Sequence, residues 1–151
     1  MHNIHLAKAR IFGSSQYPSI TGTVSFTDAP LGVWVAAEIR NLPKTKAGFY
    51  GFHVHELGSC EPMEEPYFSM SGAHYNPEDI GHPKHAGDFP NILATKRGYA
   101  KLFFLTDRFK VGQIINRSVI IHLNSDDLKS QPSGDAGVKI ACGKILPALR
   151  I

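Results

Sequence analysis

Glycine and proline divide the whole chain into short segments, and this punctuation limits what it can fold into. The 151 residues include 14 glycines and 10 prolines, and no long stretch has helical periodicity. The runs between the turn signals are rich in β-branched and aromatic residues, which is typical of strands. From Val33 to Ile39, apolar residues fall on alternate positions, while Glu38 and Arg40 fall on the other face.

This pattern predicts seven strands and a weaker eighth. They lie near Ile4–Phe12, Ile20–Thr27, Val33–Asn41, Gly48–His55, Gly98–Thr106, Val119–Leu123 and Val138–Ile145, and the weaker candidate is Ile92–Lys96. Short strands at this spacing favour an all-β sandwich or barrel. The length and a hydrophobic content of 42% favour a single domain over residues 1–151.

Two segments break the strand pattern. Glu56–Asn91 contains five prolines, four glycines and three of the eight histidines, and Asn124–Gly137 is a second irregular stretch. Loops this long within a compact domain are usually functional or disordered. The histidines favour function for the first one.

Composition argues against two classes of partner. The net charge is only +3, the basic residues never form a run of five, and no aromatic platform is interleaved with them, so nucleic-acid binding is not expected. No stretch reaches the roughly 20 apolar residues of a membrane span. The first ten residues lack the apolar region of a signal peptide. The location is expected to be cytoplasmic if the chain is full-length, and secreted or periplasmic if a signal was removed.

The histidines form the chemically informative set. His53 and His55 end a predicted strand, where a period of two places both imidazoles on one face. In the first long loop, His74, His82, His85 and Asp88 lie within fifteen residues and together suit tetrahedral Zn²⁺. The alternative is a polar surface loop that happens to contain histidines.

The remaining histidines are weaker candidates. His122 follows an apolar run and, considered alone, is more often an edge residue with a satisfied side chain than a ligand. His2 and His5 are expected on the surface near the N-terminus. The six internal histidines exceed the needs of one ion by one or two. Two adjacent ions that share an imidazolate would use them all.

Four sequence strings carry a resemblance to the copper/zinc superoxide dismutase family. They are Gly51-Phe52-His53-Val54-His55-Glu56, Gly72-Ala73-His74-Tyr75-Asn76-Pro77, His85-Ala86-Gly87-Asp88 and the run from Gly134 to Gly143, and the similarity extends from about Ala7 to Leu146. It implies an eight-stranded antiparallel Greek-key barrel and conversion of superoxide to dioxygen and hydrogen peroxide. Superoxide would be the substrate, and a homodimer is a further expectation.

Carried over residue by residue, the resemblance implies two metal sites with one shared ligand. The implied copper ligands are His53, His55, His74 and His122, and the implied zinc ligands are His74, His82, His85 and Asp88. Asp126 would hydrogen-bond one histidine of each site. In catalysis, copper would change oxidation state, and His74 would leave it, take up a proton and pass this proton to the peroxide.

The two cysteines, Cys60 and Cys142, could be separate buried thiols on their number alone. The resemblance implies instead that they form a disulfide that ties the long loop to the barrel. Such a bond would close a loop of more than 80 residues. By restricting the unfolded chain, it would add roughly 4–5 kcal/mol to the free energy of unfolding.

The chain departs from the family pattern at three places. Only two residues separate His82 from His85, the stretch from Cys60 to His74 is long, and the second loop is short, as in bacterial-type members. Lys139 stands where the family places the arginine that attracts the anion, so the charge is kept without the planar fork. Lys129 is a second candidate for a positive funnel.

Two other functions compete with the dismutase. A copper- and zinc-binding protein without enzymatic activity could use the same barrel, although the complete ligand sets and the cation at position 139 favour the enzyme. A zinc hydrolase needs an open coordination position, whereas the implied zinc set already has four protein ligands.

Overall fold

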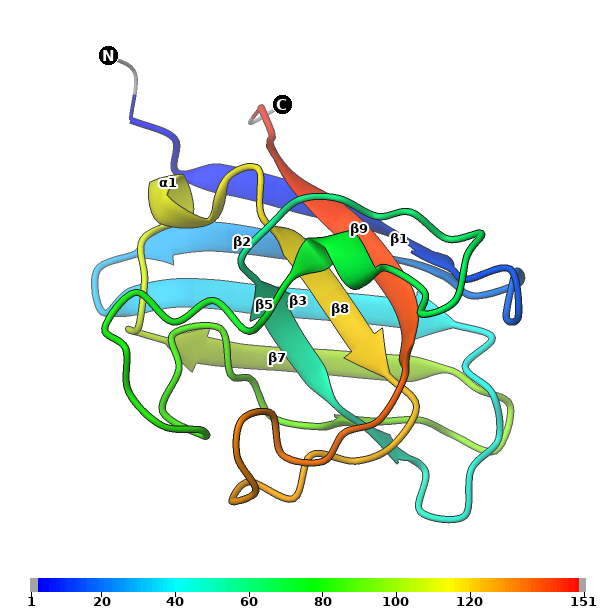
Figure 1. Ribbon diagram of the computed structural model, residues 1–151. Helices are drawn as coiled ribbons and strands as arrows, with labels where there is room; N and C mark the ends of the chain where they lie inside the picture. The colour runs from blue at the N-terminus through cyan, green and yellow to red at the C-terminus, as the bar shows by residue number, and fades with distance from the viewer. Residues whose placement is uncertain (1–2, 150–151) are drawn as a thin grey trace.

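Antiparallel strands make up nearly all of the secondary structure in the computed structural model, which describes residues 3–149 (Figure 1). The elements in chain order are β1 (Leu6–Gly13), β2 (Thr21–Ala29), β3 (Gly32–Arg40), β4 (Phe49–Tyr50), β5 (Phe52–His55), the 3₁₀-helix η1 (Ser69–Ser71), β6 (Ile92–Leu93), β7 (Ala100–Thr106), α1 (Val111–Ile114), β8 (Ser118–His122) and β9 (Lys139–Pro147). Neither described helix is long and apolar enough to span a membrane.

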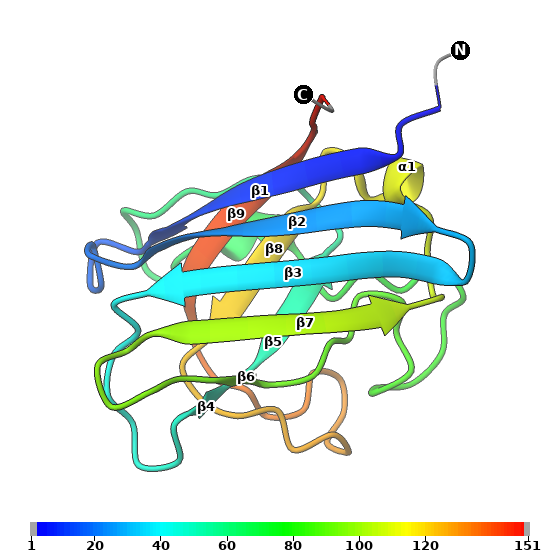
Figure 2. The same cartoon turned by 180° about the vertical axis from the view of Figure 1, so that it is seen from behind.

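The strands close into a barrel. Seven of them form one sheet in the order β5-β8-β9-β1-β2-β3-β7, and β4 pairs with β6. A bridge between Ala94 and Ala100 connects the β6 segment to β7, while Gly51 alone separates β4 from β5 (Figure 2). Because β3 lies beside β7 rather than β4, the chain crosses over in the manner of a Greek key. The predicted barrel is confirmed, with eight strands when β4 and β5 count as one.

Some predicted boundaries differ from the structure. The predicted strand Gly48–His55 is divided at Gly51, because Tyr50 pairs with β6 whereas Phe52 pairs with β8. The weaker candidate Ile92–Lys96 is only two residues long as a strand and then turns. Helices α1 and η1 were not predicted, since four and three residues are too few to establish a helical period.

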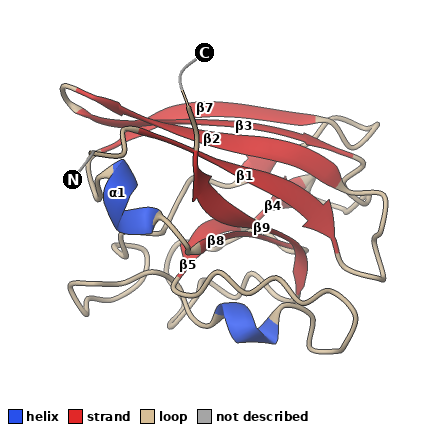
Figure 3. Ribbon diagram, turned by 90° about the horizontal axis from the view of Figure 1, so that it is seen from above, coloured by secondary structure: helices blue, strands red, loops and turns tan. Residues whose placement is uncertain are grey.

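The barrel interior contains the apolar face predicted for β3. Val33, Val35, Ala37 and Ile39 are all buried in the main hydrophobic cluster. A smaller cluster lies outside the barrel, where Phe68 covers Ile120 and Cys142. Figure 3 shows the first long loop, with η1, beneath β5, β8 and β9. This cover explains why β8 is buried on both faces.

Candidate metal centre

Strands β5 and β8 carry three of the candidate ligands. His53 and His55 are two residues apart on β5, which pairs with β8, and His122 ends β8. The backbone N–H of His122 donates to the carbonyl of Gly51 over 2.8 Å. All three imidazoles are buried. The barrel backbone therefore brings these histidines together.

The first loop lies along the open edge of β5. His74 is bridged to His55 and Asp88 to His53. Between these bridges, Val54 donates its N–H to the carbonyl of Gly87 and accepts from the N–H of Tyr75. Backbone hydrogen bonds thus place two loop residues directly beside the strand histidines, as though the loop supplied a further strand.

The side chains gather into two groups that share His74. One group contains His53, His55, His74 and His122, and the other contains His74, His82, His85 and Asp88. Within each group, one potential ligand atom per residue lies within 4.8 Å of every other. The structure brings together all seven residues that the sequence nominated as ligands.

The donor atoms of the first group fit a cation. The Nδ1 atoms of His55 and His122 lie 2.8 and 3.0 Å from the carbonyl oxygens of Gly72 and Gly137, so each Nδ1 carries the proton and donates. Their Nε2 atoms therefore expose lone pairs, and these atoms lie 3.3 Å apart. Two lone pairs facing each other at this distance repel unless a cation is bound between them.

Three further ring nitrogens are buried without a hydrogen-bond partner and mark metal-facing atoms. His53 Nδ1, His74 Nε2 and His82 Nδ1 are buried in this way. His82 Nδ1 lies 3.0 Å from a carboxylate oxygen of Asp88 without forming a hydrogen bond. The cost of leaving buried polar atoms unpaired is removed when a metal ion binds them. The residues present therefore fit two metal ions.

His74 presents one ring nitrogen to each group. Its Nδ1 lies 2.8 Å from Oδ1 of Asp88 and 3.2 Å from Nδ1 of His85. Its Nε2 is the unpaired atom, and the imidazole ring lies 3.9 Å from that of His53, centroid to centroid. This arrangement is what a histidine shared between two ions requires.

Burial keeps the strand histidines neutral, the form that binds metal. It lowers the pKa of His53 to about 4, despite the opposing hydrogen bond to Asp126. Burial also lowers the pKa of His55 and His122 well below the ordinary range, with added repulsion from neighbouring imidazoles. Burial alone would raise the pKa of Asp88, but the hydrogen bond and charges of the adjacent histidines lower it overall.

Asp126 joins the two groups from the second loop. Its carboxylate accepts hydrogen bonds from Nε2 of His53 at 2.7 Å and Nε2 of His82 at 2.8 Å. Protons on these Nε2 atoms leave both Nδ1 atoms free to bind metal. Burial acts to raise the pKa of Asp126, but the two histidine hydrogen bonds outweigh it and hold the pKa far below its usual range.

Two further residues fix Asp126 itself. The side-chain amide of Asn91 donates to the backbone carbonyl of Asp126 at 2.9 Å and accepts from its N–H at 2.8 Å. Gly134 has φ of 74°, and a Cβ there would lie 1.9 Å from Oδ1 of Asp126. Only glycine fits this position. No sequence pattern selected Asn91, because an asparagine in a loop is common.

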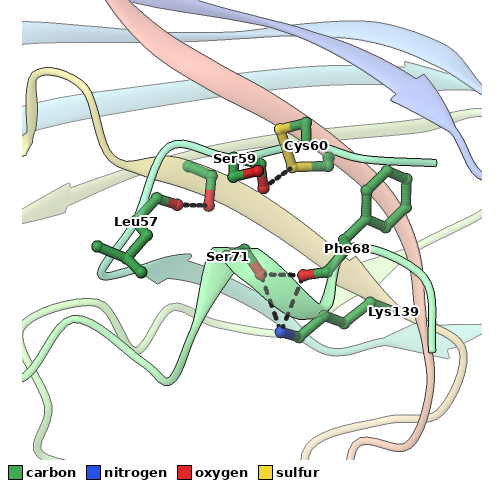
Figure 4. The surroundings of a disulfide bond; sticks show 8 residues. Leu57, Ser59, Cys60, Phe68, Ser71 and Lys139 are labelled. Atoms are coloured by element: carbon green, nitrogen blue, oxygen red, sulfur yellow. Dashed lines mark hydrogen bonds between the residues drawn. A yellow bond between two sulfur atoms is a disulfide. The ribbon is translucent and has the colours of Figure 1, made fainter. Parts of the chain in front are cut away.

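Lys139, the first residue of β9, is anchored beside the first group. Its ammonium donates to Ser71 Oγ at 2.8 Å, the Gly72 carbonyl at 3.0 Å and the Phe68 carbonyl at 3.3 Å; Figure 4 shows the contacts with Ser71 and Phe68. The same Gly72 oxygen accepts from His55. Burial lowers the pKa of Lys139 below its ordinary value.

An open cavity of about 490 Å³ connects this lysine to the histidines. Its lining includes His55, His74, His122 and Lys139. Lys129 is exposed on the second loop and does not line the cavity. Of the two lysines nominated from the sequence, Lys139 is therefore the one that faces the cavity.

The predicted disulfide is confirmed. Cys60 on the first loop is bonded to Cys142 on β9, 82 residues away, with Cα atoms 5.6 Å apart (Figure 4). The bond ties the loop to the strand that begins with Lys139. His5, by contrast, is exposed, as expected for a surface residue, and its Nδ1 lies 3.0 Å from a carboxylate oxygen of Asp28. His2 lies outside the described residues.

An antiparallel barrel with two histidine groups that share one imidazole defines a class of two-metal proteins. A family model described as copper/zinc superoxide dismutase matches residues 20–145. The superoxide dismutase [Cu-Zn] of Deinococcus radiodurans is 32% identical over 145 residues, or 85% of this chain and 78% of the relative. That of Legionella pneumophila is 32% identical over 144 residues, or 91% of this chain and 85% of the relative.

A solved structure agrees with these matches. The crystal structure of the clock protein EA4 has a TM-score of 0.79 and 32% identity, and the match covers 98% of this chain and 100% of that chain. The chain belongs to the copper/zinc superoxide dismutase family. The reaction of that family, dismutation of superoxide with copper and zinc as cofactors, is the function of this chain.

Proposed function

We propose that the first group, His53, His55, His74 and His122, holds the copper and that the second, His74, His82, His85 and Asp88, holds the zinc. His74 is the bridge. The observation that carries this assignment is the position of its two ring nitrogens, with Nδ1 among the second group and Nε2 buried and unpaired. The second group contains the carboxylate, which suits zinc, whereas the first group contains only imidazoles.

Bound copper would supply the one-electron redox couple by which one superoxide is oxidised to dioxygen and the next is reduced to hydrogen peroxide. The chain supplies the proton path and the access route. Nε2 of His74 is the atom that takes up one proton and passes it to the reduced product, and solvent supplies the second proton of hydrogen peroxide. Nδ1 of the same ring and Asp88 would both bind the zinc, which would keep His74 in place while the proton moves.

Lys139 is proposed to attract the anion rather than to bind it tightly. All three N–H donors of its ammonium are engaged by the loop of η1. Its charge nevertheless faces the cavity that it shares with His55, His74 and His122. A positive charge beside a cavity raises the local concentration of a small anion without direct contact. Lys129 is assigned a smaller contribution of the same kind, because it lies outside that lining.

Storage of the two metals without catalysis is the alternative that the sequence left open. The cavity beside the first group favours the enzyme, since storage needs no open route for an anion. A zinc hydrolase is disfavoured because four protein side chains converge on the second site and leave no position for a water molecule.

The proposed function is tested on a single sample of purified, metal-loaded protein. Copper and zinc are quantified by mass spectrometry, and superoxide decay is followed by pulse radiolysis. We expect one copper and one zinc per chain, with decay in proportion to the copper content. Two metals without accelerated decay would support storage, and zinc alone would support neither account.

Membership of the family leads us to propose a homodimer. The composition leads us to propose a single domain that binds neither nucleic acid nor membranes. Exposed apolar side chains such as Trp34 and Phe103, which stack with centroids 4.7 Å apart, leave surface on which copies could associate. Light scattering during gel filtration measures the mass directly. We expect twice the chain mass of 16.6 kDa, and the monomer mass would refute the dimer.

A further inference from the structure

The backbone of His82 is held by a side chain from the opposite loop. The N–H of His82 donates to Oε1 of Gln131 at 2.9 Å, and Nε2 of Gln131 donates to the carbonyl of His82 at 2.6 Å. One amide thus satisfies both backbone groups of a single residue across 49 positions of sequence. It does so in the way that a neighbouring strand would.

This contact lies at the turn of the first loop that carries His82 and His85. The turn that carries His82 and His85 is short, and within it Lys84 donates its N–H to the carbonyl of Gly81 at 2.9 Å. Arg108 holds the other side of the turn by donating to the carbonyls of Pro83 and His85, at 2.9 and 3.0 Å. Gln131 therefore supplies the contact on the side of the second loop.

The second loop therefore forms hydrogen bonds with His82 at two points. Gln131 holds its backbone, and Asp126 accepts a hydrogen bond from its Nε2. With the main chain and one ring nitrogen fixed, the remaining nitrogen, Nδ1, is directed at the second metal group, where it is buried without a hydrogen-bond partner. The imidazole cannot turn away without breaking one of these contacts.

We propose that Gln131 is a positioning residue for zinc: its amide sets the main chain of His82 so that Nδ1 faces the ion. This inference rests on the assignment of zinc to the second group. Contacts that orient metal ligands are typically worth 10- to 100-fold in metal affinity. The competing explanation is that Gln131 merely fastens two loops together, which would affect stability but not the geometry of the site.

The test compares Gln131→Met, which keeps the length of the side chain but removes its donor and acceptor, with wild-type protein. Gln113→Met is the matched control, because Gln113 caps the backbone of α1, away from the metal groups. In copper-free protein loaded with zinc, release to a chromophoric chelator is followed by absorbance. In a second sample, Co²⁺ replaces zinc, and its visible spectrum reports the ligand geometry.

We expect zinc release about 10-fold faster and an altered cobalt spectrum in Gln131→Met, with neither change in Gln113→Met. Gln131→Glu keeps the acceptor for His82 N–H but loses the donor, so its effect should have the same direction. Wild-type rates and spectra in Gln131→Met would overturn the inference, even if the metal-free protein unfolded more easily. Failure of the wild type itself to bind zinc would instead overturn the assignment of the second group.

Discussion

The two metal groups are built in different ways, although they share a ligand and lie side by side. Three of the four side chains of the first group, the proposed copper group, extend from strands β5 and β8, whose backbones are hydrogen-bonded within the barrel. Every side chain of the second group, the proposed zinc group, extends from the first loop. His74 and Asp88 of this group lie beside β5, but His82 is held by Asp126 and Gln131 of the second loop. The copper group should therefore tolerate loss of loop structure better than the zinc group does.

The largest effect should follow removal of a copper ligand on a strand. In His53→Ala or His122→Ala, copper and activity should be lost while zinc is retained, because the loop that holds zinc remains in place. Metal content and superoxide decay are measured on the same preparation. His5→Ala, an exposed histidine bonded to Asp28, is the control and should behave as wild type. Full copper occupancy in either ligand variant would show that the assignment is wrong.

Loss of the disulfide should lower the stability of the whole molecule. The bond spans 82 residues, and the chain-entropy model gives a cost of roughly 4–5 kcal/mol in the free energy of unfolding when it is removed. In the Cys60→Ser/Cys142→Ser variant we expect a lower melting temperature and faster metal release, with the zinc group affected more than the copper group. Calorimetry and chelator assays measure these effects. Addition of a reductant to this variant should change neither its melting temperature nor its rate of metal release.

Removal of the zinc carboxylate should loosen the loop before it harms the barrel. In Asp88→Ala, zinc affinity should fall, and residues 74–88 should exchange amide hydrogens faster while β1 to β3 keep their protection. Hydrogen exchange with mass spectrometry resolves the two regions. Glu78→Ala is the control, because it removes an exposed carboxylate from the same loop. Equal zinc affinity in Asp88→Ala and wild type would exclude Asp88 as a ligand.

The smallest effects should come from the charge at the cavity. Lys139→Ala should lower the rate several-fold, Lys139→Glu should lower it most, and Lys139→Arg should keep or raise it. The wild-type rate should fall with ionic strength, because salt limits the field to about 8–10 Å. Lys129→Ala, which lies outside the cavity lining, should change little. Equal rates at low salt for lysine, alanine and glutamate at position 139 would show that Lys139 does not attract the anion.

The same lysine should give the enzyme an alkaline limit. Burial lowers the pKa of Lys139 below its ordinary value of 10.5, so the ammonium loses its proton, and with it the attraction for the anion, at a lower pH than a free lysine would. Activity should fall as the pH rises through this lowered pKa. Because arginine stays charged, Lys139→Arg should move the fall to higher pH. An identical pH profile in the two proteins would argue against this role.

The contrast between the two groups also explains how much could be predicted from the sequence. Alternation of apolar residues identified β3, and a period of two placed His53 and His55 on one face, because both patterns depend on neighbouring residues. The roles of Asn91 and Gln131 left no such signal, since each depends on the backbone of a residue far away in the chain. The division at Gly51 was missed for a similar reason: it depends on two different strand partners.

The bridge that His74 forms between the two groups is tested most directly by magnetic coupling. Protein is loaded with Cu²⁺ in both groups, and its electron paramagnetic resonance spectrum is recorded at low temperature. If the two ring nitrogens of His74 bind one ion each, the spins should couple through the imidazolate, and the signal should fall far below that expected for two ions. Two independent Cu²⁺ signals that account for all of the metal would contradict the bridge.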